Sequence, residues 1–194
     1  MASQRLELVL VRHGDTEWSR TGRHTGRTDV ALTATGRHEA EAVGRRLAGR
    51  EFVRVLSSPA SRALETCRLA GFGDRAETDA DLREWDYGSY EGRTTPEIRA
   101  ERPDWTLWND GVPDGEAIAD VGARADRVLA ELETIAGAVL VFAHGHFLRV
   151  LAARWLELAP ASGRLFALDP ATVGALGYEH EWRVIRRWNE LCGA

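Results

Sequence analysis

The stretch Leu6-Glu7-Leu8-Val9-Leu10-Val11-Arg12-His13-Gly14 decides the fold. Its first six residues form a short, mostly apolar and β-branched run bounded by charge and glycine, a pattern typical of a buried strand. Arg12 and His13 follow where that strand ends, and Gly14 lets the chain turn sharply. Ligands of open α/β sheets bind at the carboxyl ends of strands. The stretch therefore predicts a strand with a candidate site at its end, although a lone histidine there would more often be structural.

Strand and helix patterns alternate along the rest of the chain. Residues 14–32 are expected to form a loop, and apolar runs predict strands at 52–56, 138–143, 172–178 and 182–185, the last two as a hairpin. Helices are expected after the cap Thr33, from Ser58-Pro59, along the stripe from Val121 to Ile135, and from His144. This alternation predicts a layered α/β domain with a largely parallel central sheet.

One segment interrupts the alternation. Between Leu82 and Gly115 the chain is rich in Trp, Tyr, Gly and Pro and follows neither period, so we expect an insertion over one end of the sheet. No repeat, low-complexity tract or linker divides the sequence. Residues 1–194 are therefore expected to form a single domain.

The charge and composition of the chain indicate which kinds of binding partner to expect. The chain has 25 basic and 30 acidic residues and a formal net charge of -5, so its surface as a whole attracts neither nucleic acid nor anionic membranes. Cys67 and Cys192 show no metal-type or CxxC spacing, which suits a reducing cytoplasm. No signal peptide and no apolar run long enough to cross a bilayer is present, so we expect a cytoplasmic protein without a membrane partner.

An anionic substrate must then meet a local cluster of positive charge. Arg62 falls in the first turn of the helix expected after Ser58-Pro59, where the N-terminal N–H groups already favour an anion. The helix dipole disfavours an arginine in that position, so its presence there needs another reason. An anion bound between the arginine and the helix end supplies that reason.

His144 and Glu84 complete the predicted site. His144 follows a buried strand as His13 does, and a bound phosphoryl group would relieve the repulsion among these histidines and nearby arginines. Glu84 lies in the interrupted segment, where Trp85 and Tyr87 would shield it. A carboxylate so placed could hold a proton for a leaving alkoxide.

Together these motifs resemble the signature of the histidine phosphatase, or phosphoglycerate mutase-like, superfamily. The likeness begins with Leu10-Val11-Arg12-His13-Gly14-Asp15-Thr16. It continues in the family's order through Thr25-Gly26, Leu32-Thr33, Ser58-Pro59, Arg62, Glu84, Gly88, Glu91-Gly92, Pro113-Asp114-Gly115-Glu116 and Ala143-His144-Gly145. It covers nearly the whole chain and points to the acid phosphatase and sugar-bisphosphatase-like branch. The resemblance implies a three-layer α/β/α sandwich and a metal-independent phosphatase without a cofactor.

The resemblance also assigns catalytic roles. His13 would attack phosphorus through one ring nitrogen while the other donates to backbone. Arg12, Arg62 and His144 would hold the equatorial oxygens. Glu84 would protonate the leaving oxygen and then take a proton from the water that hydrolyses the phosphohistidine.

Five further residues are expected to contact substrate: Ser19, Thr25, Gly26, Tyr87 and Gly145. Ser19 stands where many relatives have asparagine, and a serine hydroxyl reaches less far. The other histidines are treated separately. His38 and His180 are expected at the surface or a strand end, His146 behind the site, and His24 either in contact with substrate or not. The expected substrate is a small phosphorylated metabolite, and relatives suggest a homodimer.

Two alternative functions stay open. A phosphoglycerate mutase would return the phosphoryl group to substrate, but the acidic Asp86 in Glu84-Trp85-Asp86-Tyr87 would repel a carboxylated substrate where the mutases carry a basic residue. A binding module without turnover predicts a damaged catalytic set, whereas all five expected catalytic residues are present. The sequence therefore favours a phosphatase.

Overall fold

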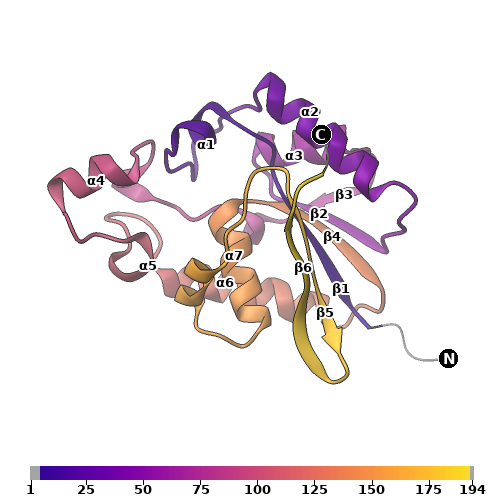
Figure 1. The fold of residues 1–194 in the computed structure, drawn as a ribbon. Helices are drawn as coiled ribbons and strands as arrows, with labels where there is room; N and C mark the ends of the chain where they lie inside the picture. The colour runs from indigo at the N-terminus through magenta and orange to yellow at the C-terminus, as the bar shows by residue number, and fades with distance from the viewer. Residues whose placement is uncertain (1–4, 193–194) are drawn as a thin grey trace.

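The computed structural model describes residues 5–192 and is built around a six-stranded sheet (Figure 1). Its strands are β1 (Glu7–Arg12), β2 (Arg54–Ser57), β3 (Ala76–Thr78), β4 (Ala138–Ala143), β5 (Val173–Glu179) and β6 (Trp182–Glu190). Their order is β3-β2-β4-β1-β5-β6. Strands β1 to β4 run parallel, and the β5–β6 hairpin joins β1 antiparallel. The predicted α/β fold with a mostly parallel sheet is confirmed.

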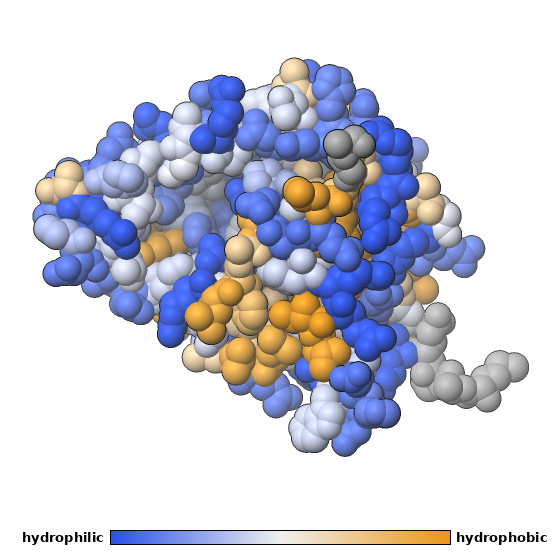
Figure 2. All heavy atoms as spheres, viewed as in Figure 1, coloured by the Kyte–Doolittle hydropathy of each residue, from blue (hydrophilic) through white to orange (hydrophobic). Residues whose placement is uncertain are grey.

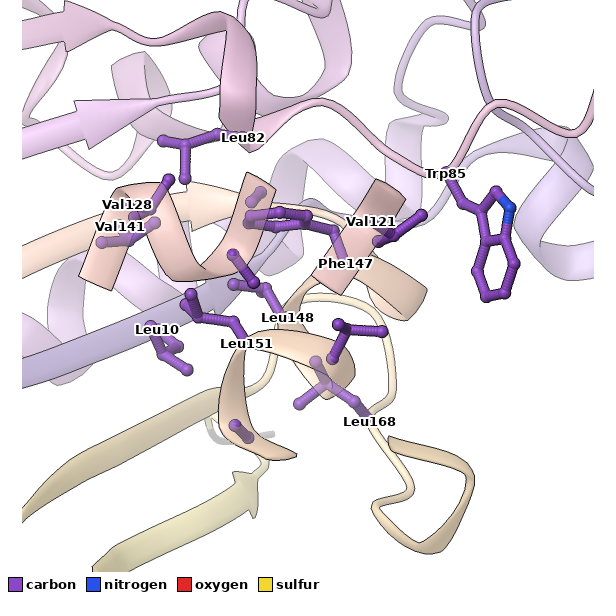
Figure 3. Close-up of a cluster of buried hydrophobic side chains, with 14 of the residues drawn as sticks. Leu10, Leu82, Trp85, Val121, Val128, Val141, Phe147, Leu148, Leu151 and Leu168 are labelled. Atoms are coloured by element: carbon purple, nitrogen blue, oxygen red, sulfur yellow. The ribbon is translucent and has the colours of Figure 1, made fainter. Parts of the chain in front are cut away.

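Helices cover both faces of the sheet and complete the three layers. Figure 1 shows α2 (Ala34–Leu47) and α3 (Ser61–Leu69) on one side, and α6 (Ile118–Leu132) and α7 (Gly145–Trp155) on the other. β1 contributes to both cores because successive strand residues point to opposite faces. Leu8 and Leu10 pack with α6 and α7, as Figure 3 shows for Leu10, whereas Val9 and Val11 pack with α2 and α3.

The strand register brings the predicted site together. Arg12 of β1 lies opposite Ala143 of β4, so His13 and His144 follow at the same edge of the sheet. The N–H of His13 donates to the carbonyl of Ala143 at 3.0 Å. On the other side of β4, the N–H of Ser58 donates to Phe142 at 2.9 Å. Residues far apart in the sequence thus meet because three parallel strands end together.

Gly14 serves a different purpose from the one expected. It was predicted to permit a sharp turn, but it is absent from the glycines with positive φ. A Cβ on Gly14 would instead collide with the backbone carbonyl of Gly36, near the start of α2. The glycine is required because two backbone segments approach closely there.

The helix predicted from Ser58-Pro59 exists, but its predicted first residue was wrong. α3 begins at Ser61 with Ala60 as its N-cap and no side-chain cap, rather than at Ser58-Pro59. The hydroxyl of Ser58 is engaged elsewhere, because it bonds the Nε2 atom of His144 at 2.7 Å. Arg62 nevertheless lies in the first turn, as predicted.

The loop expected at 14–32 contains a short helix, α1 (Glu17–Thr21). A capping box between Thr16 and Ser19 starts it, with Ser19 in place of the usual Glu or Gln, so the sequence lacked the common signature. The predicted strand at 52–56 lies at 54–57 instead, and Ile135 falls beyond the end of α6. The short strand β3 was not predicted, because three residues carry little periodic signal.

The interrupted segment extends beside the sheet as an arm, seen at the left of Figure 1. It contains a 3-10 turn, η3 (Gly88–Tyr90), followed by α4 (Thr95–Glu101) and α5 (Leu107–Asp110). Three other 3-10 turns connect elements: η1 (Gly73–Arg75), η2 (Ala80–Leu82) and η4 (Pro160–Leu165). Figure 2 shows a largely hydrophilic surface that is hollowed between this arm and the body. Within residues 5–192, no helix combines the length and apolarity needed to cross a membrane.

Candidate active site

A cavity of about 240 Å³ lies at the carboxyl ends of β1 and β4, beside the arm. Seven of the ten predicted site residues line it: Arg12, His13, Ser19, Thr25, Glu84, Tyr87 and Gly145. Gly26 lines a neighbouring cavity of about 320 Å³, which shares Glu84 with the first. The two remaining residues, Arg62 and His144, are fully buried close to His13. The structure therefore gathers the predicted set into one region.

His13 has the tautomer that a nucleophile needs. Its Nδ1 atom lies 2.8 Å from the carbonyl oxygen of Gly14, and a carbonyl can only accept, so Nδ1 carries the proton. Nε2 is left with an unprotonated lone pair. Burial, followed by the charges of Arg62 and Arg12, holds the pKa of His13 well below its usual range. The ring is therefore neutral and nucleophilic in mildly acidic as well as neutral solution.

His144 is fixed by contacts on both ring nitrogens. The Nε–H of Arg62 donates to Nδ1 at 3.3 Å, so Nε2 carries the proton and donates to the hydroxyl of Ser58 at 2.7 Å. Burial, and then the charge of Arg62, lowers the pKa of His144 well below its usual range. Its ring centroid lies 5.2 Å from that of His13. In this arrangement neither ring nitrogen has a free N–H for a phosphoryl oxygen. His144 therefore does not offer the donor that was predicted to hold an equatorial oxygen.

Arg62 organises the loop in front of it. Its Nη1 donates to the carbonyl of Thr28 at 3.0 Å, and its Nη2 donates to the carbonyls of Thr25 and Gly26 at 3.1 and 3.0 Å. With the bond to His144, these contacts use four of its five N–H groups. Arg62 thus fixes the loop in addition to placing positive charge beside His13.

Arg12 keeps donor capacity directed at the site. Its Nη1 donates to the carbonyl of Leu168 at 2.5 Å, while its Nε is buried without a partner among the described residues. A Cβ on Gly145 would stand 3.2 Å from the guanidinium carbon, so glycine leaves the room that this side chain occupies. An unpaired buried N–H is costly, and an anion in the cavity would satisfy it.

Glu84 is held as a carboxylate against the start of α7. Its Oε1 accepts from the N–H groups of Trp85 and Phe147, both at 2.9 Å, and its Oε2 accepts from the N–H of His146 at 3.0 Å. Two bonds use both lone pairs of Oε1, whereas Oε2 retains one. Oε2 is therefore the atom that can take up or deliver a proton.

Three predicted substrate contacts are already engaged within the protein. The hydroxyl of Ser19 closes the capping box of α1 and donates to Asp15 or to Thr16. The N–H of Gly26 donates to both carboxylate oxygens of Glu91, at 2.9 and 3.0 Å. The hydroxyl of Thr25 donates to the carbonyl of Arg23 at 3.1 Å. Ser19 and Thr25 line the cavity, but their hydroxyl groups donate to neighbouring protein atoms.

The far side of the cavity is a cluster of rings. The hydroxyl of Tyr87 bonds Nδ1 of His146 at 2.6 Å, and the ring of His24 packs on Tyr87 with centroids 4.8 Å apart. Nε2 of His24 is buried and has no partner among the described residues. His146 lines the cavity rather than lying behind it. His38 and His180 are exposed, as predicted.

Two residues of this site, Arg149 and Glu91, had no predicted role. Arg149 of α7 lines the cavity and lies over the ring of Trp108 at 4.7 Å. Its place on α7, four residues after Gly145 and three after His146, could have indicated that it faces the same side. Glu91 was part of the family pattern but had no assigned role, and its carboxylate also accepts from the N–H of Thr28 at 3.1 Å.

The buried and partly buried histidines of the site predict a pH-dependent free energy of unfolding. Burial, as the first cause, lowers the pKa of His13, His144 and His146 well below the usual value, and lowers that of His24 to about 4. In the unfolded chain each titrates near 6.5, so below that pH the unfolded state binds more protons. The free energy of unfolding should then fall with decreasing pH, by up to about 1.4 kcal/mol per pH unit for each histidine. Urea unfolding at several pH values between 7.5 and 5 measures the slope.

Two variants show which histidines cause the pH dependence of the free energy of unfolding. His146→Gln should reduce the pH dependence by the share of one histidine, whereas His180→Gln, at an exposed position, should leave it unchanged. An equal slope in wild type and His146→Gln would contradict the assignment of a neutral, partly buried ring.

A neutral histidine beside the buried Arg62 and the partly buried Arg12, with a carboxylate across the cavity, defines a site for transferring an oxyanion such as a phosphoryl group. Comparison with known proteins agrees. The model of the histidine phosphatase superfamily (branch 1) matches residues 8–191. The chain belongs to this superfamily, and the expectation of a histidine phosphatase is confirmed.

Three relatives show where the chain stands within the family. An acid phosphatase of Mycobacterium tuberculosis is 48% identical over 177 residues, which cover 89% of this chain and 87% of the relative. A sedoheptulose 1,7-bisphosphatase of Saccharomyces cerevisiae is 36% identical over 183 residues, 77% of this chain and 67% of the relative. The solved structure of an open reading frame from Mycobacterium tuberculosis superposes with a TM-score of 0.91 at 44% identity, covering 96% and 98% of the two chains.

Proposed function

We propose that the protein hydrolyses small phosphomonoesters, such as sugar phosphates or similar metabolites, through a phosphohistidine on His13 and without a metal. The observation that carries the proposal is the neutral His13, whose tautomer leaves Nε2 unprotonated in the wall of a cavity that Arg12 also lines. The acid phosphatase and the sugar bisphosphatase among its relatives support this substrate class.

In the first step, Nε2 of His13 attacks phosphorus and a P–N bond forms as the P–O bond to the leaving group breaks. Arg12 and Arg62 offset the negative charge on the phosphoryl oxygens. Oε2 of Glu84 keeps an open lone pair, and the negative charge of the arriving dianionic substrate favours uptake of a proton from solvent there. That proton passes to the leaving alkoxide.

In the second step, water attacks the phosphohistidine. Oε2 of Glu84, now ionised again, takes a proton from the water as the P–N bond breaks. His13 returns to its starting tautomer because Nδ1 stays bonded to the carbonyl of Gly14 throughout. Inorganic phosphate and the alcohol are the products.

The charge of Asp86 does not exclude a mutase. Asp86 was expected to repel a carboxylated substrate, but its carboxylate pairs with Arg27 at 2.7 Å and accepts from the N–H of Gly88 at 3.1 Å. These contacts largely compensate its charge. Dependence on a bisphosphate primer, rather than local charge, is therefore the observation that separates the two activities.

Metal independence, a cytoplasmic location and a homodimer are parts of this proposal that stay predictions. Among the residues that the structure describes, no three His, Cys, Asp or Glu side chains gather to hold a metal ion. Turnover in the presence of EDTA tests the first property, and sedimentation of the purified chain tests the dimer.

The proposal predicts phosphate release from p-nitrophenyl phosphate at mildly acidic to neutral pH, with EDTA present and no primer. A panel of sugar phosphates, sugar bisphosphates and phosphoglycerates then ranks the substrates by kcat/KM. Strict dependence on a bisphosphate primer would establish the mutase instead. Tight binding of phosphorylated ligands without any phosphate release would establish a binding module.

A further inference from the structure

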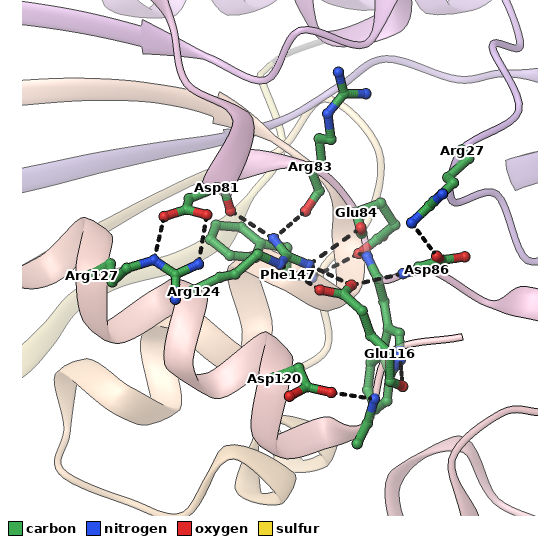
Figure 4. Close-up of polar contacts among 12 residues, drawn as sticks. Arg27, Asp81, Arg83, Glu84, Asp86, Glu116, Asp120, Arg124, Arg127 and Phe147 are labelled. Atoms are coloured by element: carbon green, nitrogen blue, oxygen red, sulfur yellow. Dashed lines mark hydrogen bonds and ion pairs between the residues drawn. The ribbon is translucent and has the colours of Figure 1, made fainter. Parts of the chain in front are cut away.

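Arg124 of α6 lies behind the loop that carries Glu84 (Figure 4). Its side chain is only 11% exposed. Nη1 donates to the carbonyls of Asp81 and Arg83 at 2.6 and 2.9 Å, and Nη2 approaches the carbonyl of Glu84 at 3.4 Å. One guanidinium therefore binds three backbone carbonyls within four residues, ending at Glu84 itself.

Glu116 holds this guanidinium from the other side. Its two carboxylate oxygens accept from Nε and Nη2 of Arg124 at 2.7 and 2.8 Å, a bidentate pair. With the three carbonyls, all five N–H groups of Arg124 are used. A lysine, with three donors and no planar fork, cannot reproduce this arrangement.

Glu116 also binds the residues that follow Glu84. Its Oε2 accepts from the N–H of Asp86 at 2.9 Å, and its backbone N–H donates to the carbonyl of Asp86 at 3.0 Å. Its own carbonyl accepts from the indole N–H of Trp85 at 2.8 Å. The chain is thus fixed immediately before and immediately after Glu84.

Arg124 further contacts the helix that receives the carboxylate. Its guanidinium lies 5.0 Å from the ring centre of Phe147, and the N–H of Phe147 donates to Oε1 of Glu84. Arg124 therefore touches both the loop that presents the carboxylate and the α7 residue that orients it. Proton transfer requires the acid within hydrogen-bond reach of the leaving oxygen, so small displacements of this loop matter.

We propose that Arg124 and Glu116 form a positioning pair that sets the placement of Oε2 of Glu84 at the leaving oxygen. This inference rests on the proposed function, in which Glu84 is the general acid. Neither residue contacts the reacting atoms: they act through the backbone of residues 81–86. Their effect should therefore depend on how much the leaving group needs a proton.

The leaving group supplies the readout. p-Nitrophenolate is stable as an anion and departs with little need of an acid, whereas the alkoxide from glycerol phosphate must be protonated. Arg124→Lys should lower kcat/KM, which excludes the later hydrolysis of the phosphohistidine, by about 10²-fold for glycerol phosphate, the lower end of what a positioned acid contributes. For p-nitrophenyl phosphate the loss should stay below about tenfold. Glu116→Gln, which keeps the size but loses the charge, should show the same selectivity to a smaller degree.

Arg127→Lys is the matched control. Arg127 lies on the same helix, is 57% exposed and binds only the carboxylate of Asp81, with both contacts at 2.7 Å. Its replacement should leave kcat/KM for both substrates within about twofold of the wild-type value, as expected for an exposed ion pair. Circular dichroism and thermal unfolding show whether each variant is folded. If Arg124→Lys does not fold, the comparison of the two substrates is made with Glu116→Gln.

The outcomes separate three conclusions. Equal losses for the two substrates in both positioning variants would overturn the proposal, because a merely structural role weakens both reactions alike. Glu84→Gln tests the underlying function: its kcat/KM should fall selectively for glycerol phosphate. If Glu84→Gln is not selective, the acid assignment itself is wrong. If it is selective and Arg124→Lys is not, only the positioning pair is wrong.

Discussion

Replacing His13 by alanine is expected to lower kcat for any phosphomonoester by roughly 10⁵- to 10⁶-fold, the loss seen when a covalent nucleophile is removed. The reason is that Nε2 of His13 is the atom that forms the bond to phosphorus, and no neighbour can replace it. Both nitrogens of His144 are engaged, with Arg62 and with Ser58. Turnover of p-nitrophenyl phosphate in EDTA measures the effect.

A trapping experiment identifies the intermediate. Substrate labelled in its phosphoryl group, quenched in base after a few milliseconds, should leave label on wild-type protein that is lost on treatment with acid, because the P–N bond of phosphohistidine is acid-labile. His13→Ala should retain none, whereas His38→Ala, at an exposed site, should behave as wild type. Residual turnover above about one thousandth in His13→Ala would contradict a nucleophilic role.

The sequence predicted the sheet and the location of the site because both depend on local signals. β1 and β4 are short apolar runs followed directly by Arg12-His13 and by His144, and parallel strands end at a common edge. The helical stripe of α6 was equally clear. Once these elements were identified, the convergence of the two histidines followed from topology alone.

The contacts inside the site could not be predicted, since they depend on orientation across the fold. Nothing local shows that Ser58 binds His144 instead of capping α3, or that Glu91 uses the N–H of Gly26. Likewise, the pairing of Asp86 with Arg27 joins two loops without periodicity. Sequence patterns indicate which residues meet, but the allocation of each donor requires three-dimensional positions.

The choice of hydrogen-bond acceptors explains how several arginines can lie close to the site. Arg62 directs most of its N–H groups at the carbonyls of one loop, and Arg124 directs three at the carbonyls of another. The carbonyls satisfy the N–H groups of Arg62 without neutralising its charge, because none of the described carboxylates forms an ion pair with it. The histidine therefore stays neutral, and the anionic substrate meets an uncompensated positive field.

Arg62→Lys is expected to lower kcat by about 10²- to 10³-fold, the magnitude of losing one well-placed oxyanion donor. It should also lower the free energy of unfolding by about 3 kcal/mol, because the carbonyls of Thr25, Gly26 and Thr28 and the Nδ1 of His144 lose their shared donor. Arg68→Lys, on the same helix and 66% exposed, should change neither quantity. Steady-state kinetics and urea unfolding measure both.

A second replacement separates charge from geometry. Lysine keeps the positive charge that helps to lower the pKa of His13, whereas Arg62→Met removes it and leaves burial and Arg12. The acid limb of the kcat/KM profile should therefore move to higher pH in Arg62→Met than in Arg62→Lys, since His13 then protonates more readily. If the two variants share one pH profile, Arg62 acts on His13 only through the loop and His144 that it holds in place.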